Sequence, residues 1–297
     1  MRQLIVSAFI CFTMLASGPV LGQAPAPSAP ALFATTKVEG TDNVYVFRYQ
    51  FHQAMFVVTP EGVIATDPIG LGRPKAVTTY IDEIRKVTSQ PVRYVIYSHS
   101  HYDHITGGKP FKDAGARFIA HANAKQRLDW LKPPNIVLPD EVVDGERTLT
   151  LGGTTLQLLY VCRNHSDSTL VVRLPKERII FAVDFIPIQS VHWRNMPDSW
   201  LDEWEESLKR VLAMDWERLI PGHPGPGGRL GTKDDVRSVL QYMGDLAAEV
   251  KKAADEGKCY DTAMKEVKLP KYESWGNYAA WLPGNVERYC LHYRSGF

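Results

Sequence analysis

The chain has 297 residues, of which 44% are hydrophobic and 23% charged, a balance typical of a globular protein and not of a disordered or fibrous one. Its formal net charge is +1 and its Lys and Arg residues are scattered, so nothing indicates a nucleic-acid partner. The length allows one large domain or two small ones, and either can bury a sizeable core.

The N-terminal segment, 1–22, is predicted to be a secretory signal peptide. It begins with Arg2, continues with an almost wholly apolar run at 4–15 and ends in small residues. The run is too short to cross a bilayer, which disfavours a membrane anchor, and no later stretch reaches about 18 apolar residues. We therefore expect a periplasmic or secreted protein with no membrane contact after signal cleavage.

Residues 23–35 are expected to form a flexible leader rich in Pro and Ala, and residues 36–297 a single domain with a helical C-terminal segment. Three cysteines remain after cleavage, namely Cys162, Cys259 and Cys290, and an odd number excludes complete pairing. Cys259 and Cys290 can pair if two C-terminal helices lie side by side. Three buried thiols are the alternative.

In chain order, the first half of the domain alternates strands with a helix. Hydrophobic patterning predicts strands at 44–48, 55–59 and 63–66, a helix at 74–87, and further strands at 92–97 and 117–120. Pro74 suits the first turn of that helix, and the short apolar run 92–97 suits a buried strand. The segment 99–104 follows this strand directly, at the end where ligand sites gather in layered α/β folds.

A second strand-rich stretch begins near Arg147. It predicts strands at 148–151, 154–161, 169–174 and 178–182, then a helix at 201–212 and a mostly helical remainder from about Lys233. Three tryptophans around the helix, Trp200, Trp204 and Trp216, are expected in the core. The order of elements suits two sheets packed back to back with helices outside.

Residues 99–104 form the sequence His-Ser-His-Tyr-Asp-His. His99 and His101 can point to the same side, since alternate residues of an extended chain share a face, and Asp103 and His104 can then turn toward a neighbouring point. Two nitrogens from the first pair, with an oxygen and a nitrogen from the second, suit two adjacent borderline cations. Desolvating this cluster without a cation would be costly, so a metal site is favoured over a packing role.

Three further residues can complete the ligand set. His165, Asp184 and His223 each lie in a short loop after a predicted strand. A lone histidine is more often a surface or core residue. The assignment of His165 and His223 as metal ligands therefore depends on how well they complete the cluster at 99–104.

The pattern H-x-H-x-D-H at 99–104, followed by His165, Asp184 and His223, resembles the metallo-β-lactamase superfamily over nearly the whole mature chain. Asp67 also resembles the family's early aspartate, which lies behind the ligands. The resemblance implies an α/β fold of the αββα sandwich type, with two mixed β-sheets flanked by helices. The metals would lie at one edge, between the two halves.

Carried over residue by residue, the resemblance assigns the metal ligands. His99, His101 and His165 would hold one zinc ion, Asp103, His104 and His223 would hold a second, and Asp184 would bridge the two. Two Zn²⁺ per chain are therefore expected, with iron or manganese left open. The aspartate at 184 resembles the ligand sets of glyoxalase II and lactonases more than that of true class B β-lactamases. His101 stands where the flavodiiron branch of the superfamily has a glutamate, which argues against a di-iron centre that reduces oxygen.

The expected activity is hydrolysis of a small ester, thioester or lactone by a metal-bridging hydroxide, since two dications lower the pKa of a shared water to about 7 or below. Asp103 is the expected catalytic residue, which orients the nucleophile or shuttles its proton. The expected partner is a small-molecule substrate. Alternatives are β-lactam hydrolysis, a zinc-binding accessory role in a periplasmic redox or cofactor pathway, and an iron sulfur dioxygenase that uses part of the same ligands.

Other residues near the ligands are candidates for substrate contacts, although packing is the commoner role of each: Tyr102, Arg163, Asn164, His192, Trp193 and Arg194. His121 is expected to be structural or to donate to a carboxylate beside the ligands. His52 and His292 have no assigned partner. The aromatic residues at 272–293 are expected to pack in the core, with a roof over the site as the weaker alternative.

Overall fold

The structure is a computed structural model that describes residues 31–296. The predicted signal peptide, 1–22, lies outside the described residues, as does most of the predicted leader. Strand β1 (Phe33–Lys37) pairs with the next strand, and the Phe33 ring stacks on Tyr49. The last residues of the predicted leader, 33–35, therefore belong to the sheet. Their backbone pairing with β2 determines their structure, although the composition of the segment before them is typical of a leader. Between residues 31 and 296, no helix has the length and apolarity needed to cross a membrane.

The first sheet has seven strands in chain order. After β1 these are β2 (Val44–Tyr49), β3 (His52–Thr59), β4 (Gly62–Thr66), β5 (Val92–Ile96), β6 (Arg117–His121) and β7 (Glu141–Val143). Strands β1 to β4 run antiparallel, whereas β4 to β7 run parallel because helical segments connect them. The parallel strands bring their C-terminal ends to one edge of the sheet, and the segment 99–104 follows β5 there.

The second sheet has five strands in the order β12-β11-β10-β9-β8. Its strands are β8 (Glu146–Leu151), β9 (Thr154–Tyr160), β10 (Leu170–Leu174), β11 (Ile179–Ala182) and β12 (Arg218–Pro221). The first four are antiparallel neighbours, and β12 returns parallel to β11 after helix α5 (Leu201–Ala213). The strands and the helix predicted for this half are confirmed, with ends that shift by no more than two residues.

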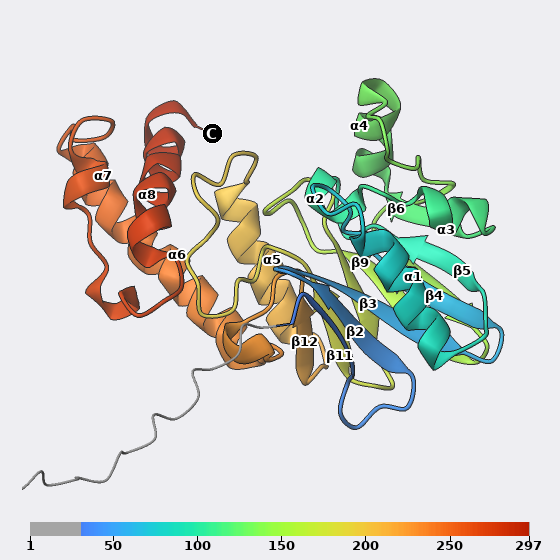
Figure 1. Cartoon of the computed structure of the whole chain (residues 1–297). Coiled ribbons are helices and arrows are strands. Elements are labelled where there is room, and N and C mark those ends of the chain that lie inside the picture. Colours follow the sequence, from blue (N-terminus) through green and yellow to red (C-terminus); the bar gives the residue numbers. More distant parts are fainter. Residues whose placement is uncertain (1–30, 297) are drawn as a thin grey trace, which may run out of the picture. The chain divides into compact units, whose positions relative to one another are not determined.

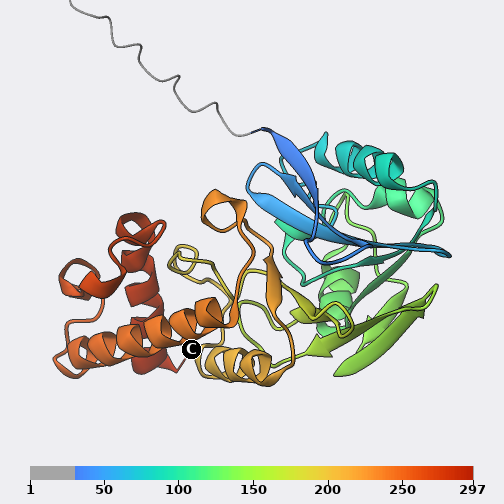
Figure 2. The same cartoon turned by 90° about the horizontal axis from the view of Figure 1, so that it is seen from below.

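The two sheets pack face to face, with side chains such as Met55 of β3 and Phe181 of β11 in the shared core. The helices are α1 (Ala76–Val87), α2 (Tyr102–Ile105), α3 (Lys109–Asp113), α4 (Ala122–Leu131), α5, α6 (Lys233–Asp255), α7 (Ala263–Glu266) and α8 (Tyr278–Ser295). Helices α1, α3 and α4 cover the outer face of the first sheet, whereas α5 and α6 lie on the side of the second sheet and α8 packs on α6 beyond them (Figures 1 and 2). The fold is the expected αββα sandwich of two mixed sheets flanked by helices.

Some elements are not indicated by hydrophobic patterning. Helix α4 buries only Ala124 and Leu128, so its apolar period is weak, and β7 is three residues long. Strand β3 begins at His52, before the predicted start at 55, because its first residues pair with the end of β2. This longer hairpin places His52 at the edge of the sheet that carries the segment 99–104.

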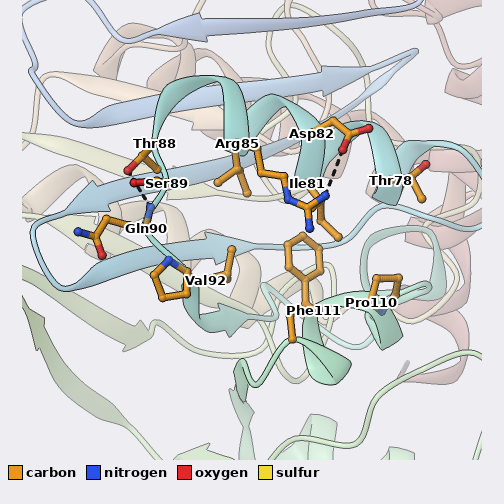
Figure 3. A pocket seen from close by; sticks show the side chains of 13 residues that line it. Thr78, Ile81, Asp82, Arg85, Thr88, Ser89, Gln90, Val92, Pro110 and Phe111 are labelled. Carbon is orange, nitrogen blue, oxygen red and sulfur yellow. Dashed lines mark hydrogen bonds and ion pairs between the residues drawn. The ribbon is translucent and has the colours of Figure 1, made fainter.

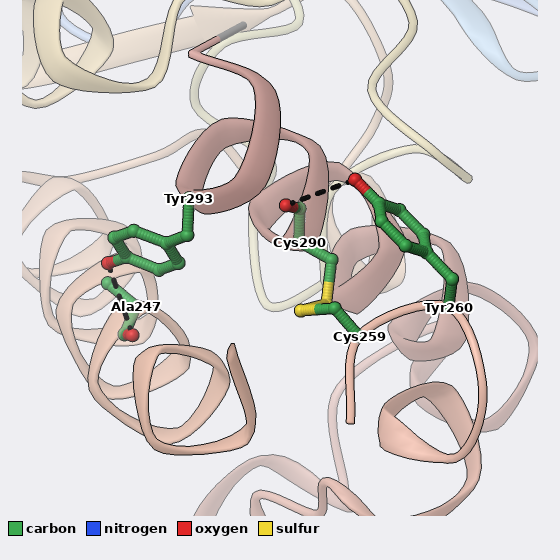
Figure 4. The surroundings of a disulfide bond; sticks show 5 residues. All are labelled: Ala247, Cys259, Tyr260, Cys290 and Tyr293. Atoms are coloured by element: carbon green, nitrogen blue, oxygen red, sulfur yellow. Dashed lines mark hydrogen bonds between the residues drawn. A yellow bond between two sulfur atoms is a disulfide. The ribbon is translucent and has the colours of Figure 1, made fainter. Parts of the chain in front are cut away.

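The C-terminal helices α6 and α8 pack side by side, and a disulfide bond joins Cys259, in the turn that follows α6, to Cys290 of α8 (Figure 4). This bond selects pairing over the alternative of three buried thiols, and Cys162 is the free cysteine among residues 31–296. The aromatic residues of this segment pack in the core as predicted, with Tyr272 and Tyr289 almost fully buried. Trp204 and Trp216 are buried as well, whereas Trp200 is half-buried.

A hollow of about 500 Å³ lies between α1 and α3 (Figure 3). Its lining includes Asp82 and Arg85 of α1, Phe111 of α3 and Val92, the first residue of β5. It therefore opens at the N-terminal end of β5, whereas the predicted ligands at 99–104 follow the C-terminal end of that strand.

Candidate metal centre

Every predicted ligand lies just beyond the C-terminal end of a strand. The segment 99–104 follows β5, His165 follows β9, Asp184 follows β11, and His223 follows β12. The two sheets are joined at this edge, because the backbone N–H of Leu170 donates to the Ser98 carbonyl at 2.7 Å. The strand ends of both sheets thus bring side chains from distant parts of the sequence to one place.

The structure brings all seven predicted ligands together, in two groups with donor atoms within 4.8 Å of one another. The first group is His99, His101, His165 and Asp184. The second is Asp103, His104 and His223, joined by His52, which is not among the predicted ligands. Asp184 lies between the groups: its Oδ2 atom is 3.5 Å from Nε2 of His99 and 3.0 Å from Nε2 of His104. Its Oδ1 atom is 3.2 Å from Nε2 of His223.

Most of these histidines turn one ring nitrogen toward the cluster and the other toward an acceptor outside it. Nδ1 of His99 is 2.9 Å from Oγ of Ser98, and Nδ1 of His223 donates to the Phe51 carbonyl at 2.6 Å. An outer acceptor keeps the proton on the outer nitrogen and leaves a lone pair on the inner one. The chain thereby presents the inner nitrogens in the form that binds a metal.

Two more outer partners are aspartates. Nδ1 of His104 is 3.4 Å from Oδ2 of the buried Asp67, whose other oxygen accepts the backbone N–H of Ser98 at 2.8 Å. Asp67 is thus placed behind the ligands, where the sequence resemblance puts it. Nε2 of His101 is 2.7 Å from Oδ2 of Asp198, while Nδ1 of His101 faces the cluster, 2.9 Å from Nε2 of His165.

The cluster is closed on one side and open on the other. The side chains of His99 and His104 are fully buried. Those of Asp103 and His223 are 36% and 43% exposed, respectively. A substrate can therefore approach from the side of Asp103 and His223.

The donor set fits a pair of divalent cations. The buried Nε2 atoms of His99 and His104 and the buried Oδ1 atom of Asp184 have no hydrogen-bond partner. Buried polar atoms without a partner are costly, and here they converge on shared points at distances of 3.0–3.5 Å. Imidazole nitrogens with few carboxylate oxygens are the donors preferred by zinc and related transition metals over calcium or magnesium.

The pKa values of the cluster follow from burial and from the facing charges. Burial lowers the pKa of His99 well below its ordinary value and that of His165 to about 4, and in both cases His101 acts in the same direction. Burial would raise the pKa of Asp184, but the facing rings of His104 and His223 together outweigh it and hold that pKa well below the usual range. Burial would lower the pKa values of His104 and His223, but the charge and hydrogen bonds of Asp184 and the other facing acceptors outweigh it and raise both. A bound metal would displace these protons, since neutral imidazoles and an ionised carboxylate are the protonation states that ligate a metal.

Gly222, directly before His223, lies against the cluster. A Cβ atom at this position would be 2.4 Å from Cγ1 of Val183, 2.8 Å from Oδ1 of Asp184 and 3.0 Å from Cε1 of His104. The close approach of the chain after β12 to Asp184 therefore requires glycine at this position.

The residues considered for substrate contacts occupy varied places. Tyr102 is 38% exposed within α2, and Trp193 is 50% exposed, with the Arg194 guanidinium 5.5 Å from its ring centre. Arg163 is an exposed partner of Glu203, to which its Nε donates at 2.9 Å.

The others are enclosed by the fold. Asn164 is buried and donates to the Cys162 carbonyl at 3.2 Å. His192 is buried, with its ring centre 4.4 Å from that of Trp204. His121 precedes α4 and accepts the backbone N–H of Asn123 at its N-terminus, and its ring stacks on Tyr160, so its role is structural.

Two residues at the cluster escape sequence reasoning. Nε2 of His52 is 3.0 Å from Oδ2 of Asp103, and Asp198 contacts His101 as described above. Neither has a spacing signal, because His52 begins a hairpin strand far upstream and Asp198 lies in a long loop. Only the folded hairpin and the folded loop bring them to the ligands.

The family model for the metallo-beta-lactamase superfamily matches residues 76–223, which hold all seven predicted ligands. Among curated relatives, the chain is 24% identical to the 2,4-dinitroanisole O-demethylase subunit alpha of Nocardioides sp. (strain JS1661) over 70% of its own length. It is 26% identical to a metallo-beta-lactamase type 2 of Bacillus cereus over 50% of its length. The matches span 61% and 58% of those relatives, respectively.

Solved structures share the fold at low sequence identity. A metallo-beta-lactamase from Pontibacter korlensis matches with a TM-score of 0.59 and 20% identity, over 70% of this chain and 99% of that one. The sec-alkylsulfatase Pisa1 from Pseudomonas sp. matches with a TM-score of 0.70 and 12% identity, over 89% of this chain and 51% of that one. These likenesses show the fold, and the family match over residues 76–223 shows that the chain belongs to the metallo-beta-lactamase superfamily.

Proposed function

We propose that this protein is an exported dizinc hydrolase that cleaves a small ester, thioester or lactone. The observation that carries the proposal is the position of Asp184, whose two carboxylate oxygens face histidines of both groups at 3.0–3.5 Å. A shared carboxylate of this kind allows two metal ions to act on one water and one substrate. Export is proposed from the N-terminal sequence alone.

The two groups divide the binding of the metals. His99, His101 and His165 would hold the first ion, Asp103, His104 and His223 the second, and Asp184 both. When bound, the ions would supply Lewis acidity toward the carbonyl oxygen and would acidify a water for attack. Zinc is proposed because histidine nitrogens dominate the donor set.

The chain's own residues would orient the reactants. The Asp103 carboxylate lies at the open side, where it can accept a hydrogen bond from the attacking water and carry its proton toward the leaving group. The buried rings of His99 and His104 form the floor and exclude solvent from beneath the reacting carbonyl.

A second candidate activity is β-lactam hydrolysis. It is favoured by the likeness to the metallo-beta-lactamase type 2 of Bacillus cereus and by the fold shared with several metallo-beta-lactamases. The O-demethylase subunit among the relatives indicates that related chains also act on substrates other than β-lactams.

Hydrolysis assays on the zinc-reconstituted full chain test the proposal. Purified protein would be offered an aliphatic lactone, a thioester, an aryl ester and nitrocefin in parallel, with Asp184→Asn as the inactive control. Turnover of an ester, thioester or lactone that is lost in the control supports the main proposal. Turnover of nitrocefin alone would replace it with β-lactam hydrolysis, and no turnover of any substrate would contradict both.

A further inference from the structure

The loop 185–200 leaves the cluster after Asp184 and returns to it at Asp198. Oδ2 of Asp198 is 2.7 Å from Nε2 of His101, and the two side chains are 35% and 25% exposed, respectively. A carboxylate at this position accepts the Nε2–H of His101 and leaves the Nδ1 lone pair facing His165 and the first group of ligands.

The C-terminal helix α8 holds the last part of this loop next to Asp198. Nε of Arg288 donates to Oγ of Ser199 at 3.0 Å, and another guanidinium nitrogen of Arg288 donates to the Ser199 carbonyl. Arg288 is 6% exposed. A guanidinium that donates to both the side chain and the backbone of one residue fixes the position of that residue, and Ser199 directly follows Asp198.

The same helix holds the middle of the loop. Nδ2 of Asn285 donates to the carbonyls of His192 at 3.0 Å and Arg194 at 2.6 Å, and its Oδ1 accepts the Tyr242 hydroxyl of α6 at 2.7 Å. Gly284 allows α8 to approach the loop, because a Cβ atom there would lie 2.7 Å from the Arg194 carbonyl oxygen. Asn285 is fully buried, so leaving these polar groups unpaired would be costly.

We propose that Asp198 is a positioning residue that fixes His101 as a ligand of the first metal, and that α8 keeps Asp198 in place through Arg288 and Asn285. The C-terminal helix lies outside the family-matched residues 76–223, yet it is tied to the metal centre through this loop. The inference rests on the proposed metal centre and not on any particular substrate.

A direct test compares metal affinity in Asp198→Asn with that in Asp42→Asn, a control at an exposed aspartate. Metal-free full-length protein would be titrated with Zn²⁺ against a chromophoric chelator, and thermal unfolding of the metal-free forms would report on the fold. We expect Asp198→Asn to weaken the binding of one of the two zinc equivalents by about tenfold to a hundredfold. The affected equivalent should be the one that His101→Ala removes, with the unfolding temperature and the control unchanged.

A double-mutant cycle tests the role of α8. Arg288→Met should weaken the same equivalent in the wild-type background and change it little further in the Asp198→Asn background, because both act through His101. Arg294→Met, at an exposed arginine of the same helix, is the control.

Two results would overturn the proposal. Unchanged affinity in Asp198→Asn would show that the contact with His101 is an ordinary surface pair, and fully additive losses in the cycle would show that Arg288 does not act through Asp198. These measurements involve no turnover, so they stand even if the proposed hydrolysis is not found.

Discussion

His52 and Asp103 meet through Nε2 and Oδ2 at 3.0 Å, although 51 residues separate them in the sequence. The Nδ1 atom of His52 is buried and has no hydrogen-bond partner, in contrast to the outer nitrogens of His99 and His223. His52 therefore lacks the outer acceptor that prepares those rings as ligands. Donation from its Nε2 to Asp103 is the role that this geometry favours.

From this contact we expect His52→Ala to weaken the second metal equivalent by about tenfold or more, because Asp103 loses the group that orients it. His52→Gln keeps an N–H donor and should retain more of the affinity. Zn²⁺ titration of the metal-free proteins measures both. If the alanine and glutamine variants both bind two ions as tightly as the wild type, the contact has no role in metal binding.

Gly222→Ala should lower metal binding, because its Cβ would collide with Val183 and Asp184. The control is Gly244→Ala within α6, where a Cβ atom meets nothing within 4 Å. The control should gain stability of about 0.5–1 kcal/mol from helix propensity. Metal content after reconstitution and urea unfolding would be measured for both. Full metal occupancy in Gly222→Ala would contradict the close approach of Gly222 to Asp184.

Much of this site follows from local sequence. The six residues 99–104 carry four ligands after a recognisable buried strand, so their clustering is predicted without knowledge of the fold. His165, Asp184 and His223 are predicted because each follows a predicted strand and because together with 99–104 they complete the ligand pattern that resembles the superfamily.

The rest depends on tertiary structure. The position of His52 depends on how far the β2–β3 hairpin extends, which is set by pairing and not by patterning. The position of Asp198 depends on a loop held by Arg288, about 90 residues further along the chain. Interactions of this range leave no periodic signal in a single sequence.

Loss of the Cys259–Cys290 bond should destabilise the protein by about 3.5 kcal/mol, since the bond closes a loop with a sequence separation of 31 residues and restricts the unfolded chain. Urea unfolding with and without a reductant measures this difference. The Cys259→Ala/Cys290→Ala double variant is the control and should not respond to reductant. If reductant lowers the stability of the wild type and of the double variant equally, the effect does not come from the Cys259–Cys290 bond.

Asp235 should make the stability of the metal-free protein depend on pH. Burial would raise its pKa, but hydrogen bonds from Arg229 and Thr232 outweigh burial and hold it below the ordinary value. A folded-state pKa below the unfolded value of about 3.9 contributes stability above that pH, and this contribution is lost as the pH falls toward the folded-state pKa.

Asp235→Asn should therefore lower the free energy of unfolding by about 1 kcal/mol at pH 7 and by much less near pH 3. Part of the loss at pH 7 comes from the N-terminal cap of α6, to which the Asp235 carboxylate belongs. Urea midpoints at the two pH values give the comparison with Asp234→Asn, an exposed neighbour in the first turn. A loss of equal size at both pH values would show that the effect does not come from the charge.

Metal analysis of the reconstituted protein tests the central claim most directly. Full-length protein stripped of metal, incubated with Zn²⁺ and passed over a desalting column should retain about two ions per chain, one for each group of ligands. Asp184→Ala should retain clearly fewer, because its carboxylate serves both groups. One ion or none in the wild type, or an unchanged count in Asp184→Ala, would contradict a shared two-metal centre.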